Sequence, residues 1–351
     1  MPPRTRCWKY FLVLILVFLI LSISIYSSKI INVVFDIEVE SSLANLEKQI
    51  LLIKQQPKIE QTPILESDDY QRLINLSNFT FISISNETCK TFLLVLISSA
   101  PKNFKRRKVI RDTWGQNDAK VKTLFMIGSV IQTEIQQSLN YENVLYKDIV
   151  QGNFQDSYDN LTYKSVMALK YVTYYCPNAK YILKADDDIF VNMPLIKNYL
   201  ANDISPYGVA NFIQCHLLLN SPIFRGNSSK WSIPDSFFPG ESKYPPYCSG
   251  AWAIISPDVI FKLYTQSQKT AYLNIEDIFL FVLAGAKYPE LNFIDTKPVS
   301  LWNNWNVSDL TTGKFDHINF LFGTFEMKEE DLRIAWEYVT KLPVKTSIFD
   351  K

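Results

Sequence analysis

The segment Tyr181–Asn192, with the sequence YILKADDDIFVN, restricts the possible folds of this chain more than any other stretch. An apolar run of strand length ends there in three consecutive aspartates, and a second apolar run follows. In α/β proteins, ligands usually bind at the carboxyl ends of the buried strands. Carboxylates beside a core are costly unless a cation pairs with them, and their hard oxygens suit magnesium or manganese. The segment predicts a divalent metal site in an α/β fold, with an acidic surface turn or a calcium loop as the alternative.

Further patterns along the chain also indicate an α/β domain. Continuous apolar runs at Thr91–Ser99 and Lys122–Ile127 predict two more buried strands. Over Leu161–Tyr175, side chains suited to packing recur at intervals of four and three residues, which predicts a packed helix. The basic stretch Lys105–Arg111 predicts a shorter helix. Strands that alternate with helices favour a mostly parallel central sheet.

The N-terminal region predicts a membrane anchor. Tyr10–Tyr26 contains 17 residues without a charge, and basic residues precede it. At 1.5 Å per residue this helix would reach roughly 25 Å, enough for a thin bilayer. The basic side should remain in the cytoplasm, so residues 1–9 are expected to form a cytoplasmic tail and residues 10–26 a signal-anchor. A cleaved signal peptide is the alternative, but no A-x-A-like site follows.

Residues 27–88 are predicted to form a lumenal stem with a short helix at Ser42–Lys54, ahead of a catalytic domain at 89–345. Six N-x-S/T sites fit this topology. They begin at Asn75, Asn78, Asn86, Asn160, Asn227 and Asn306.

The five cysteines divide between two compartments in this topology. Cys7 would face the reducing cytosol, whereas four cysteines would face the oxidising side, where three pairings are possible. Four buried free thiols are the alternative. The four residues are Cys89, Cys176, Cys215 and Cys248.

Charge excludes one class of partner. The chain has 36 Lys and Arg against 35 Asp and Glu, a net charge of +1. No overall field is available to attract nucleic acid, so any anionic ligand must be held locally.

Five segments, in order, resemble the family of beta-1,3-galactosyltransferases and beta-1,3-N-acetylglucosaminyltransferases. They span most of residues 91–340. The segments are RRKVIRDTWG at Arg106–Gly115, DSYDNLTYKS at Asp156–Ser165, KADDDIFVN at Lys184–Asn192, YPPYCSGAWAIIS at Tyr244–Ser256 and IEDIF at Ile275–Phe279.

The resemblance implies a GT-A-like glycosyltransferase fold, a UDP-sugar donor, a manganese ion and inversion at the anomeric carbon. Asp186 and Asp188 would then bind the metal, and Asp187 would contact the ribose or serve a structural role. Arg107 and Arg111 match basic positions that bind phosphate or brace the nucleotide pocket. Ordinary salt bridges are the alternative for both arginines.

Inversion requires a base that takes the proton from the acceptor hydroxyl. Asp277 matches the candidate base of the family, and Glu276 is its rival. Both acids could instead simply cap a helix that begins near Ile278. Gly250 would let the backbone approach a ligand closely, or would form a plain turn. Trp231 and Trp252 could stack on sugars or pack in the core.

Two positions depart from the family pattern. Phe281 stands where the family commonly has a glycine, and we expect it to intrude on space for the acceptor or the sugar. A histidine ligand is expected near Phe325 but is absent, and His317 lies several residues upstream.

The expected activity is transfer of galactose from UDP-galactose to the 3-hydroxyl of an acceptor glycan on protein or lipid, by a single-pass type II protein of the Golgi membrane. Transfer from UDP-GlcNAc with the same residues is one alternative. A catalytically silent glycan-binding membrane protein and a calcium-dependent lectin are the others.

Overall fold

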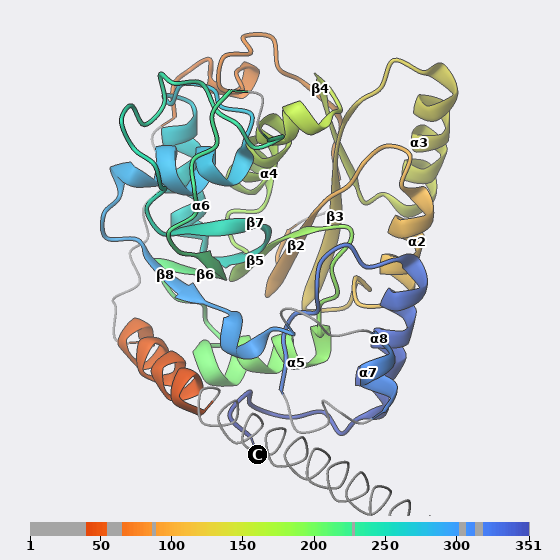
Figure 1. Ribbon diagram of the computed structural model, residues 1–351. Helices are drawn as coiled ribbons and strands as arrows, with labels where there is room; N and C mark the ends of the chain where they lie inside the picture. The colour runs from red at the N-terminus through yellow and green to blue at the C-terminus, as the bar shows by residue number, and fades with distance from the viewer. Residues whose placement is uncertain are drawn as a thin grey trace, which may run out of the picture. The chain divides into compact units, whose positions relative to one another are not determined.

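The computed structural model describes residues 40–54, 65–85, 89–226, 229–301, 307–312 and 319–350 (Figure 1). The predicted tail at 1–9 and anchor at 10–26 lie outside these ranges. No helix within these ranges has the length and hydrophobicity needed to cross a bilayer. A helix over residues 40–54 confirms the one predicted at Ser42–Lys54.

One sheet organises the large unit of residues 49–351. Within the described residues, eight strands form it in the order β1-β4-β3-β2-β5-β7-β6-β8. The strands are β1 (Phe81–Ser83), β2 (Leu93–Ser98), β3 (Val121–Ser129), β4 (Ile149–Gln155), β5 (Tyr181–Asp186), β6 (Phe212–Leu218), β7 (Tyr247–Ile255) and β8 (Asn292–Asp295).

The sheet has a parallel centre and mixed edges. The neighbours β4, β3, β2 and β5 all run parallel, which confirms the three predicted strands and their common direction. Beyond β5 the chain departs from the mostly parallel expectation, because β7 is antiparallel to both β5 and β6. The parallel centre matters for the site, since it brings four carboxyl ends to one edge.

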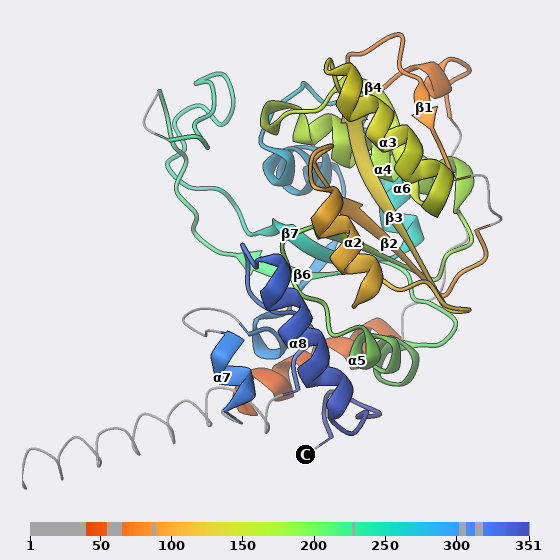
Figure 2. The ribbon, with the colours of Figure 1, turned by 90° about the vertical axis from the view of Figure 1, so that its right-hand side faces the viewer.

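Helices cover both faces of the sheet. In Figure 1, α4 and α6 lie on one side of β2 and β3, and α2, α3 and α8 lie on the other; Figure 2 shows α2 and α3 in front of the sheet. The helices α2 and α4 confirm the two predicted ones. The helical segments are α2 (Phe104–Asp112), α3 (Thr133–Tyr146), η2 (Tyr158–Asn160), α4 (Leu161–Tyr175), α5 (Met193–Asn198), η3 (Tyr199–Ile204), α6 (Pro257–Ser267), η4 (Ile278–Ala284), η5 (Gly285–Lys287), η6 (Lys297–Val299), α7 (Val307–Thr311) and α8 (Glu329–Lys341), with η1 at Asp69–Gln71.

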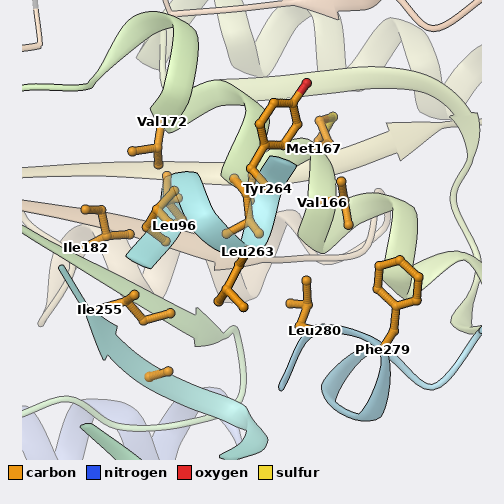
Figure 3. Close-up of a cluster of buried hydrophobic side chains, with 14 of the residues drawn as sticks. Leu96, Val166, Met167, Val172, Ile182, Ile255, Leu263, Tyr264, Phe279 and Leu280 are labelled. Atoms are coloured by element: carbon orange, nitrogen blue, oxygen red, sulfur yellow. The ribbon is translucent and has the colours of Figure 1, made fainter. Parts of the chain in front are cut away.

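The core beside α4 joins α6 and η4 to the sheet (Figure 3). Phe281, in η4, is buried in this core and its ring meets Phe293 edge-on at 6.3 Å between centroids. The expectation that Phe281 intrudes on the binding site is therefore not met, because η4 turns this side chain inward. Labelled core residues are Leu96, Val166, Met167, Val172, Ile182, Ile255, Leu263, Tyr264, Phe279 and Leu280.

Part of the segment predicted as stem joins the folded unit. Strand β1 pairs antiparallel with β4, and Asp69 in η1 is buried. The ammonium group of Lys170, fully buried in α4, donates hydrogen bonds to the backbone oxygens of Asp69 and Arg72 and to the hydroxyl of Tyr264. The hydroxyl of Tyr264 in turn donates to the Asp69 carboxylate.

Two disulfides select one of the three possible pairings. Cys89 pairs with Cys176, and Cys215 pairs with Cys248. The first ties the chain ahead of β2 to the end of α4, and the second joins β6 to β7. The free-thiol alternative is wrong for these four residues.

Candidate active site

A cleft opens at the carboxyl ends of the parallel strands. It has a volume of about 680 Å³, and its lining includes the last residue of each central strand. These residues are Ser98 of β2, Ser129 of β3, Gln155 of β4 and Asp186 of β5. The edge of the sheet that was predicted to bind ligands therefore contains a cleft, which is the usual place for a ligand site in α/β sheets.

All three aspartates of the acidic cluster line this cleft. The middle carboxylate, Asp187, is already engaged. It accepts hydrogen bonds from Ser99 Oγ at 2.6 Å, from Asn103 Nδ2 at 3.0 Å and from the guanidinium of Arg106 at 3.2 Å. This position fits the structural contact predicted for Asp187, because its charge is neutralised inside the protein.

The outer carboxylates, Asp186 and Asp188, are in a different environment. Among the described residues, neither has a cationic side chain within 4.0 Å. Burial, and then the negative charge of Glu276, raises the pKa of Asp186 to about 8, although Lys184 opposes the shift. Burial, and then the charge of Asp187, also raises the pKa of Asp188. Two desolvated carboxylates of this kind favour the arrival of a cation.

This donor set fits a divalent ion that takes part of its shell from elsewhere. No group of three or more His, Cys, Asp or Glu side chains in the described ranges is arranged to hold a metal. Asp186 and Asp188 offer two carboxylates, and an ion bound there would need further oxygens from a diphosphate or from water. Magnesium-type sites are built in this way, from one or two carboxylates plus substrate phosphates.

Glu276 is held beside the same cluster. Its Oε1 accepts a hydrogen bond from Lys184 Nζ at 3.0 Å, and its Oε2 accepts one from Ser165 Oγ at 2.9 Å. Lys184 also donates to the backbone oxygen of Gly250 at 2.7 Å. Both carboxylate oxygens of Glu276 are therefore hydrogen-bonded, and the side chain links Lys184 to Ser165.

Gly250 permits this arrangement by lacking a side chain. A Cβ atom at Gly250 would lie 2.4 Å from Glu276 Oε1 and 3.9 Å from the Cβ of Asp277. Gly250 therefore lies against Glu276 and Asp277. The close backbone approach that was expected at this glycine is made to a protein side chain.

Asp277 fills the capping role foreseen as the alternative for it, and its pKa is shifted. Its Oδ1 accepts a hydrogen bond from the backbone N–H of Ile278 at 2.8 Å and so caps η4. Burial, and then the charge of Glu276, raises the pKa of Asp277 to about 6, while Lys184 opposes the shift. A carboxylate with this pKa is ionised at neutral pH and basic enough to accept a proton.

Arg107 occupies a bracing position. Its guanidinium is fully buried, pairs with Glu142 at 2.6 Å, and donates to the backbone oxygens of Ala100 and Pro101 at 2.6 and 3.1 Å. Ala100 and Pro101 line the cleft, so Arg107 supports its wall from behind.

Arg111 lies away from the cleft. It pairs with Glu142 at 2.8 Å and Asp148 at 2.7 Å, and its guanidinium stands 4.0 Å from the Tyr146 ring centroid. The salt-bridge alternative fits Arg111, because its charge is used within the protein.

Arg106 and Lys164 were not singled out from the sequence, yet both line the cleft. Lys164 Nζ pairs with Asp156 at 2.9 Å and donates to the backbone oxygen of Ser99 at 2.8 Å. Both lie in segments that carry the family resemblance, which was the available signal.

The position near Phe325 is aromatic. The ring of Phe325 stacks on Trp252, with 5.0 Å between ring centroids, and meets His216 edge-on, with 6.4 Å between centroids. Trp252 is fully buried, so it packs in the core and does not offer a face to a sugar. His317 lies outside the described residues.

Comparisons with known proteins identify a family for this sequence. The family profile described as Galactosyltransferase matches residues 105–288, more than half of the chain. Human beta-1,3-galactosyltransferase 1 is 36% identical over 217 residues, which covers 60% of this chain and 65% of that protein. Lactosylceramide 1,3-N-acetyl-beta-D-glucosaminyltransferase A of Xenopus laevis is 36% identical over 229 residues, which covers 61% of this chain and 60% of the relative.

Among solved structures, the galactosyltransferase LgtC in complex with donor and acceptor sugar analogs shares 11% identity, with 72% of this chain and 97% of that chain covered. Its TM-score of 0.34 is too low to establish a common fold. The sequence matches suffice for classification: this chain belongs to the galactosyltransferase family.

Proposed function

We propose that the protein is an inverting, metal-dependent glycosyltransferase of the GT-A type, which moves galactose from UDP-galactose to the 3-hydroxyl of an acceptor glycan on protein or lipid. One observation carries the proposal. Asp186 and Asp188 line a cleft at the ends of four parallel strands, and Lys184 links the Glu276–Asp277 segment to the same cluster. Family membership supports sugar transfer.

Donor binding would use the cleft. Asp186 and Asp188 would hold a manganese ion, which when bound acts as a Lewis acid for the negative charge that develops on the leaving diphosphate. Arg106, Lys102 and Lys164 place cationic side chains in the lining, where an anionic donor is favoured. Arg106 also fixes Asp187 and thereby the turn that carries the two proposed ligands.

Proton transfer is assigned to Asp277. Its carboxylate takes the proton from the acceptor hydroxyl while that oxygen attacks the anomeric carbon. The bond to the diphosphate breaks on the opposite face, so the configuration inverts. Glu276 cannot take this role without losing its bonds to Lys184 and Ser165, so it keeps Asp277 in place and maintains its raised pKa.

A second donor is supported by the relatives. The Xenopus protein and a rat lactosylceramide 1,3-N-acetyl-beta-D-glucosaminyltransferase, which is 33% identical over 251 residues, carry names of GlcNAc transferases. Transfer of N-acetylglucosamine from UDP-GlcNAc is therefore the alternative activity.

We also propose that the protein resides in the Golgi membrane as a single-pass type II protein, anchored by residues 10–26. Two disulfides support an oxidising compartment. Protease added to intact vesicles should leave the bulk of the chain uncut.

UDP release by the full-length, detergent-solubilised protein tests the activity. A panel of UDP-sugars with manganese should show turnover with one donor, and a chelator should abolish it. Asp188→Asn and Asp277→Asn should each lower kcat/KM by about 100-fold or more. Glu337→Gln on α8 is the matched control, because 69% of that side chain is exposed and it is not part of the cleft lining. Unchanged turnover in both site variants would refute the assignment.

A further inference from the structure

The loop between β6 and β7 is described over residues 219–226 and 229–246. Figure 2 shows it as the teal segment that projects from the β6–β7 end of the sheet. Side-chain hydrogen bonds order the described part of this loop. The guanidinium of Arg225 donates to the backbone oxygens of Pro234, Phe237 and Phe238 at 2.7 to 2.8 Å. These bonds fix the path of the loop.

At its outer part the loop presents an exposed aromatic ring beside the cleft. Trp231 is 49% exposed, and Lys230 Nζ lies 4.8 Å from the centroid of its ring. The same ammonium group lies 5.5 Å from the ring of Tyr158, which is 50% exposed and lines the cleft. Two cation–π contacts thus hold Trp231 next to the cleft wall.

At its base the loop leads into β7, which lies against the Glu276–Asp277 segment at Gly250. The ring of Tyr244 packs on Tyr247, the first residue of β7, at 5.7 Å. Three residues further along β7 is Gly250, where a Cβ atom would lie 3.9 Å from that of Asp277. The loop therefore connects the strand that packs against the proposed base with the wall of the proposed donor cleft.

We infer that Trp231, whose ring and that of Tyr158 both contact the Lys230 ammonium group, is the platform on which the acceptor saccharide stacks. A pyranose presents a face of C–H groups that packs on an exposed aromatic ring, and its hydroxyls can accept hydrogen bonds from the ammonium group of Lys230. Trp231 is not part of the cleft lining, so it borders the donor cleft from outside. This inference rests on the proposed function.

The test compares Trp231→Ala with Tyr207→Ala in the full-length protein. Tyr207 is 77% exposed and precedes Gly208, which packs on Lys180 just ahead of β5, at the strand end opposite the cleft. The acceptor probes are methyl β-glycosides of galactose, N-acetylglucosamine and N-acetylgalactosamine. Trp231→Ala should raise the acceptor KM roughly tenfold, with kcat and acceptor-independent UDP release unchanged. Tyr207→Ala should change none of these, and Trp231→Phe should restore most of the affinity.

Failures of the two proposals are distinguishable. Turnover by the wild type, with an unaltered acceptor KM in Trp231→Ala, would overturn the platform and leave the transferase standing. If no donor is turned over, ligand-observed NMR of the same methyl glycosides decides. Binding that Trp231→Ala weakens would support the platform alone, whereas equal binding, or no binding to the wild type, would overturn it.

Discussion

Gly250 shows how much of the site depends on a single missing atom. Lys184 reaches its backbone oxygen, and Glu276 fills the space that a side chain would take. Since neither contact involves a ligand, the glycine shapes the site through the protein itself.

Gly250→Ala should therefore reduce kcat by about tenfold or more and lower the free energy of unfolding by about 1–3 kcal/mol, because the new Cβ would lie 2.4 Å from Glu276 Oε1. Urea unfolding and steady-state kinetics measure both effects. In the Glu276→Ala background the same glycine change should cost much less stability, since the clashing atom is gone. Equal costs in the two backgrounds would contradict the steric explanation.

The pH dependence of the reaction should report Asp277. A base must be deprotonated, and the pKa of this carboxyl is raised to about 6, so kcat/KM should fall tenfold per pH unit below pH 6 and stay level above it. The charge of Glu276 contributes to the raised pKa, so Glu276→Gln should move the acidic limb to lower pH. A pH–rate profile with the limb shifted upward in this variant would disprove the electrostatic coupling.

At the scale of elements, η1 and β1 are fastened to α4 and β4. Lys170 and Asp69 form a buried ion pair at 3.7 Å, and the hydroxyl of Tyr174 donates to the same carboxylate at 2.7 Å. Burial, opposed by the charge of Asp69, lowers the pKa of Lys170 to about 8.

Lys170→Met should lower the free energy of unfolding by about 3–5 kcal/mol, because it leaves the carboxylate of Asp69 buried without its cation. The double variant Asp69→Asn, Lys170→Met should recover part of this loss. The folded-state pKa of Lys170 lies below that of the unfolded chain, so the unfolded state binds more protons above pH 8. Wild-type stability should accordingly rise relative to Lys170→Met between pH 7.5 and 9, as urea titrations at both pH values can show.

At the scale of the whole molecule, the disulfides close loops of different length. Cys89–Cys176 spans 87 residues and Cys215–Cys248 spans 33. Loop-closure entropy assigns them about 4.6 and about 3.7 kcal/mol. The double alanine variant of the first pair should therefore lower the free energy of unfolding more than that of the second. Guanidinium denaturation of both variants provides the comparison, and the reverse order would contradict the entropic account.

The sequence predicted three of the four central strands and α4, because continuous apolar runs and a regular stripe are local signals; β4 was not predicted. Helix α3 escaped prediction, since Tyr141, Val144 and Leu145 are exposed and blur its apolar face. In the site, the sequence analysis named Arg107 and missed Arg106. Neighbouring residues on a helix point about 100° apart, and only packing shows that Arg106 faces the cleft. The contact between Gly250 and Glu276 is tertiary and has no local pattern. The roles of the individual acids stay predictions.

The pairing of β1 with β4 has a practical consequence for producing a soluble form of this protein. A secreted version that starts at residue 89 would discard β1 and the η1 groups that bind the ammonium of Lys170, and would leave the edge of β4 open to aggregation. A start near residue 65 keeps these contacts and is the better choice for expression and crystallisation.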